Sequence, residues 1–346
     1  MTISPTASRS KAPRTVVLHQ FVGIGDLVWH IPYFRAVALQ SEGGRVAVIA
    51  SPTTFARELL QGEEWVSEVI DFDRRPRRSE RRQGRHSGLV GVFRMARELR
   101  GLGFERIVLF SAHPNRGLLA WLARIPERLG YGCSPWQRMF LNKPPYIAPY
   151  RGGSVSVFND AASFSIAHGF CAARIVPKLR RPDAAVAALA PQLAHLPRPL
   201  YSFAIGTSEP FKQWGAPCFA ALASELVERG CGVLLLGGPA EDDVAREIVE
   251  LVPADKRHAV QVQTRGSITD TVAALWLSDA CVGNDTGVTN LAVACDRPTF
   301  ALLGPRPLLD LDPLMRMIRA PRLTDIDCAT VVREFASHHA PGFAAR

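Results

Sequence analysis

The sequence lacks the features of disulfide-bonded, zinc-binding, membrane-spanning and secreted proteins. Its seven cysteines include no C-x-x-C pair, which favours reduced structural thiols in the cytosol over disulfides or a zinc site. It has no run of roughly 18 apolar residues, so no membrane-spanning helix is expected. The first fourteen residues are polar and lack the apolar core of a secretory signal, so we expect a disordered leader and a cytoplasmic protein.

Composition indicates a soluble globular protein with room for two domains. The chain has 346 residues, of which 47% are hydrophobic and 21% charged. Lys and Arg number 41 against 32 Asp and Glu, giving a formal net charge of +9. Such an excess suits nucleic acid, an anionic membrane or an acidic substrate. No nucleic-acid-binding motif accompanies the charge, so nucleic acid is not an expected partner.

Strand-like and helix-like segments alternate in both halves, which predicts an α/β fold with parallel sheets. Strands are expected at 15–19, 45–50, 66–72, 106–110, 200–205, 232–236, 259–263 and 299–303. Helices are expected at 27–40, 53–60, 89–102, 118–123, 158–168, 217–229 and 268–277. We expect a leader at 1–14, a first domain at 15–175, a partly helical linker at 176–199 and a second domain at 200–346. The tail beyond residue 308 could pack back across the first domain.

A polar turn in the second half has the composition of an anion site. Asp285, Thr286 and Gly287 follow a short strand and precede a helix that starts near Val288. Free N–H groups and the helix dipole at such a turn suit a diphosphate. Gly287 permits close backbone approach, and the Thr286 hydroxyl can donate a further hydrogen bond. The alternative interpretation is an ordinary strand-to-helix turn capped by Asp285.

A second turn, Gly23-Ile-Gly-Asp26, follows the first strand. Gly23 and Gly25 suggest a dinucleotide fingerprint, but Val28 stands where the third glycine is required, so that motif fails. Asp26 lies where open α/β sheets place their ligands, at the carboxyl end of a strand. Its carboxylate could cap the following helix or act as a general base.

A third segment, residues 206–214, follows the first strand of the second half. Lys212 beside the small hydroxyl residues Thr207 and Ser208 suits phosphate binding, because an ammonium group is a mobile point charge. The alternative is a solvated surface lysine.

These motifs, in this order, resemble glycosyltransferase family nine, the bacterial heptosyltransferases. The resemblance rests on Asp-Thr-Gly followed by Leu-Ala-x-Ala, a proline and Leu-Leu-Gly-Pro, on the Gly-Ile-Gly-Asp turn, on the Thr/Ser, Lys and Trp spacing at 207–214, and on segments 111–117 and 124–131. It covers residues 16 to about 305. It implies two facing Rossmann-like domains of GT-B architecture, with the active site in an interdomain cleft.

The resemblance also implies roles for single residues. Asp26 matches the base that deprotonates the acceptor hydroxyl, and Lys212 matches the lysine on the donor diphosphate. Glu241 matches the carboxylate that holds the ribose hydroxyls, although a first-turn helix Glu is an equal alternative and Asp242 competes for the assignment. Asn290 replaces the His of many relatives beside the diphosphate. Asn donates a hydrogen bond but carries no charge, which leaves the exact donor open.

An arginine-rich segment lies on the expected acceptor side. It contains seven arginines and one glutamate between positions 74 and 85. It could be a solvated loop, or it could bind the carboxylates and phosphates of keto-deoxy-octulosonate and phosphorylated lipid A. The same charge could hold the protein to an anionic inner leaflet. The predicted acceptor-binding residues are Gly25, Arg74, Arg75, Arg77, Arg78 and Asn115.

No metal or cofactor is expected. The three D-x-D patterns, at 71–73, 310–312 and 325–327, are unrelated to each other and are interpreted as chance. The resemblance implies an inverting, metal-independent transfer of heptose from ADP-heptose to inner-core lipopolysaccharide. The alternatives are a transferase for another nucleotide sugar or for a protein acceptor, and a non-catalytic nucleotide-sugar-binding protein. Loss of turnover with retained nucleotide binding in Asp26→Ala would distinguish an enzyme from a binding protein.

Overall fold

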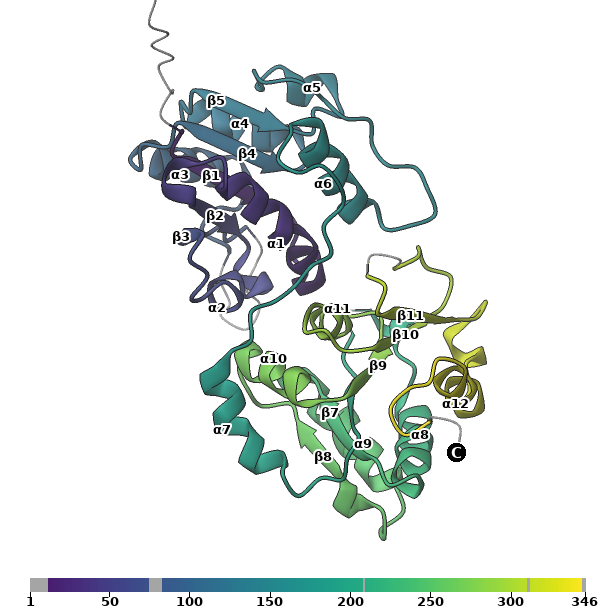
Figure 1. The fold of residues 1–346 in the computed structure, drawn as a ribbon. Helices are drawn as coiled ribbons and strands as arrows, with labels where there is room; N and C mark the ends of the chain where they lie inside the picture. Colours follow the sequence, from purple (N-terminus) through teal and green to yellow (C-terminus); the bar gives the residue numbers. More distant parts are fainter. Residues whose placement is uncertain (1–11, 75–82, 208, 310–311, 344–346) are drawn as a thin grey trace, which may run out of the picture. The chain divides into compact units, whose positions relative to one another are not determined.

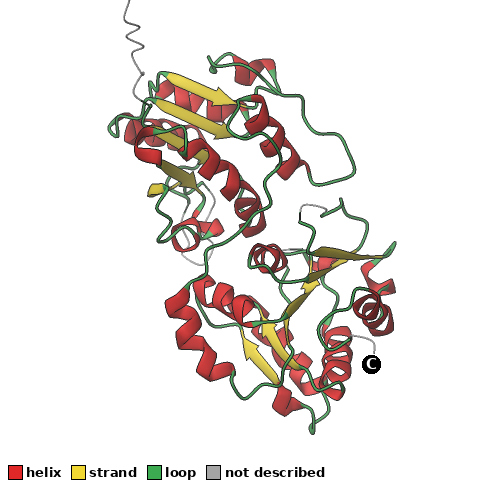
Figure 2. Cartoon of the chain, viewed as in Figure 1, coloured by secondary structure: helices red, strands yellow, loops and turns green. Residues whose placement is uncertain are grey.

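The computed structural model describes residues 12–74, 83–207, 209–309 and 312–343. Most of the expected leader therefore lies outside the described residues. The chain forms two compact units, each built on one sheet (Figure 1, Figure 2). The first unit contains the chain up to Val22, Pro32–Tyr150 and Asp160–Ile175. The second contains Gly23–Ile31, Arg151–Asn159 and Val176–Arg346.

The first sheet has five parallel strands in the order β3-β2-β1-β4-β5. They are β1 (Thr15–His19), β2 (Val46–Ala50), β3 (Val66–Asp71), β4 (Arg106–Phe110) and β5 (Glu127–Gly130). Strands β1, β2 and β4 are almost entirely buried, as expected for continuous Val, Ile and Leu runs in a sheet covered on both faces. From β1 the chain first adds β2 and β3 on one side of the sheet and then adds β4 and β5 on the other side. The switch point lies between β1 and β4, where His19 is opposite Phe110.

Helices cover this sheet. They are α1 (Ile24–Ala38), α2 (Ala56–Leu59), α3 (Gly88–Arg100), α4 (Pro114–Leu122), α5 (Pro135–Arg138) and α6 (Ser156–Ala167). The apolar side of α3 packs with α4 into a core on the sheet, through Val92, Met95 and Leu99. Short 3₁₀ turns occur at Glu42–Gly44 and Pro52–Thr54.

The second sheet has six parallel strands in the order β11-β10-β9-β6-β7-β8. They are β6 (Leu200–Ala204), β7 (Gly232–Leu236), β8 (Val260–Gln263), β9 (Ala280–Asn284), β10 (Thr299–Leu303) and β11 (Met315–Arg319). Here the switch point lies between β6 and β9, where Ala204 is opposite Gly283. The predicted fold class, two Rossmann-like α/β units with parallel sheets, is confirmed.

The helices of the second unit include one in the linker, which was expected to be partly helical, and one in the tail, for which no helix was predicted. The set is α7 (Asp183–Leu193), α8 (Ala216–Glu228), α9 (Asp242–Leu251), α10 (Ile268–Leu277), α11 (Gly287–Ala294) and α12 (Cys328–Ser337). Helix α7 lies in the expected linker and packs against α10. Helix α12 lies in the tail and packs against α8, and its Phe335 ring lies 4.5 Å from Phe300 and 5.3 Å from Tyr201. Further 3₁₀ turns occur at Pro210–Lys212, Pro239–Glu241, Arg257–Ala259 and Leu323–Asp325.

Within the described ranges, no helix is both long enough and apolar enough to cross a bilayer.

Candidate active site

Two loops of the second unit begin side by side because β6 and β9 are neighbours at the switch point. The loop after β6 leads to the 3₁₀ turn Pro210–Lys212, and the loop after β9 leads to α11. The buried Asn284 side chain joins them. Its Nδ2 donates to the Ile205 carbonyl at 2.9 Å, and its Oδ1 accepts from the Trp214 N–H at 3.1 Å. Both loops are therefore held in fixed register at the carboxyl edge of the sheet.

Lys212 lies among carboxylates in this arrangement. Its Nζ is 2.7 Å from Glu209 Oε2 and 3.6 Å from Asp285 Oδ2, and its side chain is only 12% exposed. Arg306, which follows β10, places Nε 3.5 Å from the same Asp285 oxygen. Asp285 thus lies between two cations. Sequence reasoning missed Arg306, although its place after a strand near the switch point was an available signal.

Asp26, in the first turn of α1, belongs to the same charged group. Its pKa is raised from 3.8 to about 6, chiefly by burial and also by the charge of Asp285, while a hydrogen bond from the Gly23 backbone and the charge of Lys212 oppose the rise. The structure therefore brings together Asp26, Lys212 and Asp285, three residues predicted from separate parts of the sequence.

The first turns of α1 and α11 approach each other closely at two glycines. A Cβ atom at Gly25 would lie 2.7 Å from Asn290 Nδ2, and one at Gly287 would lie 2.9 Å from Ile24 Cβ. Neither position has room for a side chain. The glycines therefore allow the helix that carries Asp26 to contact the helix that presents the predicted diphosphate site.

Asn290 forms hydrogen bonds within the protein at this contact. Its Oδ1 accepts from Trp29 Nε1 at 2.9 Å, and its Nδ2 donates to the Thr286 carbonyl at 2.8 Å. The side chain is buried, so its polar atoms link α1 to α11. Sequence reasoning did not identify Trp29, because its partner is 261 positions away.

The remaining donor-side predictions lie near the same edge of the sheet. Glu241 Oε2 accepts from the Gly238 N–H at 2.7 Å, and its carboxyl carbon would be 3.2 Å from a Cβ atom at Gly206. Asp242 instead pairs with Arg265 at 2.7 Å. Thr207 Oγ1 exchanges hydrogen bonds with the Glu209 backbone. Ser208 lies outside the described residues.

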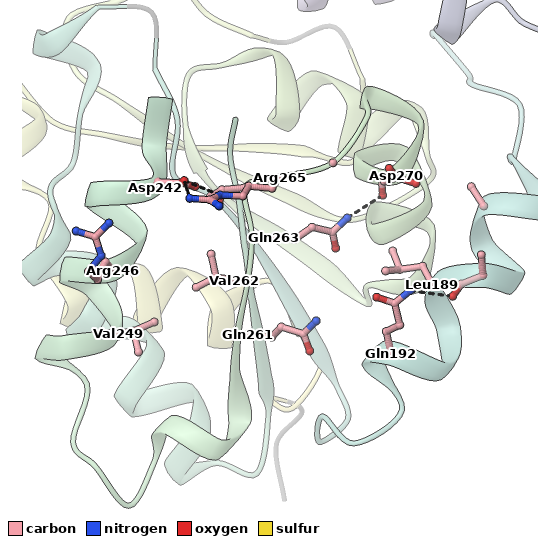
Figure 3. A pocket seen from close by; sticks show the side chains of 14 residues that line it. Leu189, Gln192, Asp242, Arg246, Val249, Gln261, Val262, Gln263, Arg265 and Asp270 are labelled. Atoms are coloured by element: carbon pink, nitrogen blue, oxygen red, sulfur yellow. Dashed lines mark hydrogen bonds and ion pairs between the residues drawn. The ribbon is translucent and has the colours of Figure 1, made fainter. Parts of the chain in front are cut away.

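A cavity of about 660 Å³ lies along β8, with side chains from α7, α9 and α10 around it (Figure 3). The Asp242–Arg265 ion pair lies at one end, and Gln263 donates to the Asp270 carbonyl at 3.3 Å. Its lining includes none of Asp26, Lys212, Glu241 or Asp285. The charged group at the switch point is thus separate from this cavity.

Only some of the predicted acceptor-side residues are among those that the structure describes. Arg74 donates to the Gln20 carbonyl, and the Asn115 N–H donates to His113 Nδ1 at 3.2 Å. Arg75, Arg77 and Arg78 lie outside the described residues. The predicted Gly25 contacts Asn290 in the second unit, as described above. Arg116, which the sequence did not single out, is buried on α4 beside Arg74.

The D-x-D carboxylates that the structure describes have protein partners. Asp71 pairs with Arg57 at 3.3 Å and Asp325 with Arg322 at 2.7 Å, while Asp327 accepts from the Thr330 N–H and caps α12. Asp310 is outside the described residues. Over those residues, no group of three His, Cys, Asp or Glu side chains is arranged to hold a metal ion.

Comparisons with known proteins identify one family. Residues 92–337 match the family described as glycosyltransferase family 9 (heptosyltransferase). The lipooligosaccharide heptosyltransferase 2 of Haemophilus influenzae is 31% identical over 129 residues, which are 35% of this chain and 37% of that protein. The chain therefore matches little more than a third of that relative's length.

Two solved structures extend the likeness of fold to most of the chain. The E. coli ADP-heptose lipopolysaccharide heptosyltransferase II superposes with a TM-score of 0.73 at 19% identity, covering 94% of this chain and 98% of that one. The E. coli heptosyltransferase WaaC with ADP-2-deoxy-2-fluoro heptose gives a TM-score of 0.70 at 17% identity, covering 94% and 100%.

Proposed function

Because the chain belongs to glycosyltransferase family 9, we propose that it transfers heptose from ADP-heptose to an inner-core sugar of lipopolysaccharide. The observation that carries the proposal is the group Asp26, Lys212 and Asp285 at the β6–β9 switch point, beside the start of α11. This arrangement places a carboxylate of raised pKa next to cations and free backbone N–H groups.

The donor diphosphate fits the start of α11. The backbone N–H groups of Gly287 and Val288 belong to the first turn of α11, where a helix offers them no carbonyl partner of its own. Lys212 and Arg306 supply positive charge on the same side, since both approach Asp285. Glu241, beside the Gly206 turn, suits two vicinal ribose hydroxyls, because a carboxylate accepts hydrogen bonds from both.

Transfer would be a single displacement with inversion. The acceptor hydroxyl oxygen attacks the anomeric carbon, Asp26 takes the hydroxyl proton, and the bond from that carbon to the diphosphate oxygen breaks. With a pKa of about 6, Asp26 is largely ionised at pH 7 and still basic enough to accept the proton. Lys212, Arg306 and the N–H groups of α11 stabilise the negative charge that develops on the departing diphosphate.

The proposal includes metal-independent chemistry and an anionic glycolipid acceptor. Lys212 and Arg306 can neutralise the diphosphate in place of a divalent ion. Arg74 and the basic segment after it suit an acceptor with phosphates or carboxylates, and also peripheral contact with the anionic inner leaflet. We propose a cytoplasmic location, which gives access to the nucleotide sugar.

The test begins with binding and ends with turnover. Thermal midpoints are measured with ADP, GDP, UDP and ADP-heptose, with EDTA present throughout. We expect ADP to raise the midpoint and ADP-heptose to raise it further. A response to UDP or GDP alone would exclude the heptose donor, and a response that requires a divalent ion would exclude metal independence.

Turnover is then assayed with truncated lipopolysaccharide and with serine-bearing peptides. We expect transfer to the lipopolysaccharide only. The variant Asp26→Asn keeps the size of the side chain and is expected to retain ADP binding while losing turnover. Transfer to peptide would indicate a protein-directed enzyme, and undiminished activity of Asp26→Asn would exclude Asp26 as the base.

A further inference from the structure

Glu209 pairs with the lysine that the proposed function assigns to the donor diphosphate. Its Oε2 lies 2.7 Å from Lys212 Nζ, whereas Asp285 Oδ2 lies 3.6 Å from the same nitrogen. The Lys212 side chain is only 12% exposed, so few directions are open to an incoming anion. The nearer of its two carboxylate partners therefore belongs to the same loop, three positions earlier.

The second cation of the site acts on Glu209 as well. A hydrogen bond from Lys212, and the charges of Lys212 and Arg306, hold the pKa of the Glu209 carboxyl below its usual range. Arg306 also places its Nε 3.5 Å from Asp285 Oδ2. Glu209 is therefore ionised at neutral pH and is attracted by both cations that the proposed function assigns to the diphosphate.

The backbone of the loop fixes where the Glu209 side chain begins. The Glu209 N–H donates to Thr207 Oγ1 at 3.2 Å, and the Glu209 carbonyl accepts from the Thr207 hydroxyl at 3.0 Å. The same carbonyl accepts from the Lys212 N–H at 2.9 Å, which closes the 3₁₀ turn Pro210–Lys212. Side chains three positions apart lie on one side of such a turn, so the carboxylate meets the ammonium group directly.

Glu209 and Asp285 differ in how easily a ligand can displace them. The Glu209 side chain is 44% exposed, so its carboxylate can turn into water. Asp285 is only 15% exposed and has Arg306 as a second partner. An exposed ion pair is held weakly, because water stabilises the separated charges nearly as well. Of the two partners of Lys212, Glu209 is therefore the one that a diphosphate can replace.

We propose that Glu209 competes with the diphosphate for Lys212 and so speeds the release of ADP after transfer. Carboxylate and phosphate oxygens form the same charge-assisted hydrogen bond with an ammonium group, and the two anions repel each other at short range. Glu209 therefore gives way when the donor binds and returns to Lys212 as ADP leaves. The inference rests on the proposed function and goes beyond it, because it assigns a residue to product release and not to the chemical step.

The competing explanation is that Glu209 holds Lys212 in position for the phosphates. The two explanations predict opposite effects of Glu209→Gln, which keeps the size of the side chain and removes its charge. For a competitor, the variant binds both donor and ADP more tightly, because the two ligands share the diphosphate. For a positioning role, it binds both more weakly. Glu225→Gln is the matched control, since it breaks an ion pair of similar length on α8, 2.6 Å from Glu225 Oε1 to Arg229 Nη2.

Binding of ADP is measured by isothermal titration calorimetry at constant ionic strength, with EDTA present. We expect Glu209→Gln to lower Kd for ADP about 3- to 10-fold and Glu225→Gln to leave it unchanged. In a Lys212→Met background the gain from Glu209→Gln should shrink, because the two anions no longer share a partner. Unchanged or weaker ADP binding by Glu209→Gln would overturn the proposal, and so would an equal gain in the Lys212→Met background. A damaged fold cannot produce the expected result, because it would weaken binding.

The dissociation rate of ADP tests the role in product release. Stopped-flow displacement of a fluorescent ADP analogue should show dissociation from Glu209→Gln slowed by about the same 3- to 10-fold, since changes within one binding site act mostly on the dissociation rate. Dissociation as fast as from the wild type would overturn this role.

A failure of the proposed function can be told apart from a failure of this inference. If the wild type binds no ADP, the donor assignment fails, and sodium pyrophosphate is titrated in its place. Tighter binding of pyrophosphate by Glu209→Gln than by the wild type would still support competition for a diphosphate. The absence of any difference between the two proteins would overturn it.

Discussion

Asp26 gives the most demanding prediction, because the same feature that suits it for catalysis should cost stability. In the folded protein its pKa is about 6, against 3.8 for an unperturbed Asp, chiefly through burial. A carboxylate is isosteric with an amide, and Asn has no charge to desolvate. We therefore expect Asp26→Asn to abolish turnover and to raise the free energy of unfolding at neutral pH.

The size and pH range of this gain follow from the pKa difference. Each pKa unit corresponds to 1.36 kcal/mol, so a rise of about two units costs the wild type about 3 kcal/mol once Asp26 is ionised. The folded state binds the extra proton, so wild-type stability falls as pH rises from 3.8 through about 6. The advantage of Asp26→Asn should thus be absent near pH 4, grow through pH 6 and level off above pH 7.

Denaturant unfolding of both proteins at a series of pH values measures this difference. The shape of the curve decides the matter, because an effect of packing alone would not vary with pH. An advantage that is constant from pH 4 to pH 8 would refute the reasoning, and so would a loss of stability at pH 8. Asp243→Asn, at an exposed position in the first turn of α9, is the matched control for the removal of one carboxylate.

Two further predictions concern the same site. The pH profile of kcat/KM should have an acid limb near pH 6, set by Asp26. Lys212→Met should move this limb to higher pH and Asp285→Asn should move it to lower pH, because Lys212 lowers and Asp285 raises the pKa of Asp26. An acid limb that neither variant moves would exclude this electrostatic coupling. Trp29→Phe should lower both the thermal midpoint and kcat, because the Asn290 oxygen is left buried without its donor, at a cost of about 1–3 kcal/mol. Trp65→Phe, whose lost partner is a solvent-accessible carboxylate, should affect the midpoint less and leave kcat unchanged; equal effects of the two variants would contradict the positioning role.

The elements that the sequence predicted well are those with strong local signals. Strands β1, β4, β7 and β10 have the expected bounds, because their Val, Ile, Leu and Phe runs are buried on both faces. Helix α10 also begins and ends as expected, because it starts with a capping box: the Ser267 hydroxyl accepts from the Asp270 N–H, and the Asp270 carboxylate accepts from the Ser267 N–H. Local chemistry alone defines these elements.

The elements that the sequence missed depend on distant partners. Strand β5, Glu127–Gly130, is short and half polar, and it exists because it pairs with the edge of β4. Helix α1 begins at Ile24, three residues before the predicted start, with Gly25 inside its first turn. The close contact of Gly25 with Asn290 accounts for a glycine at that position.

The candidate site divides in the same way. Residue types and motif spacing predicted Asp26, Lys212 and Asp285, and the parallel topology explains why they meet. The partners that tune them were not predictable, because Glu209 and Arg306 are ordinary charged residues until the loops are folded. Arg116 was missed for a related reason, because a sequence does not show that a charged side chain is buried in the fold.

The ion pairs of Lys212 and Arg306 affect how the proposed donor would bind. Lys212 has two carboxylate partners, and in the proposed complex we expect the diphosphate to replace Glu209, whose side chain is 44% exposed. Water can rehydrate the released Glu209 carboxylate, and the phosphate oxygens replace it as partners of the largely buried Lys212, so we expect the exchange to cost little. Arg306 also pairs with Asp285, so we expect Asp285 to keep a counter-charge if Lys212 binds the phosphates as proposed. We therefore expect selectivity for the donor to come from shape and hydroxyl contacts.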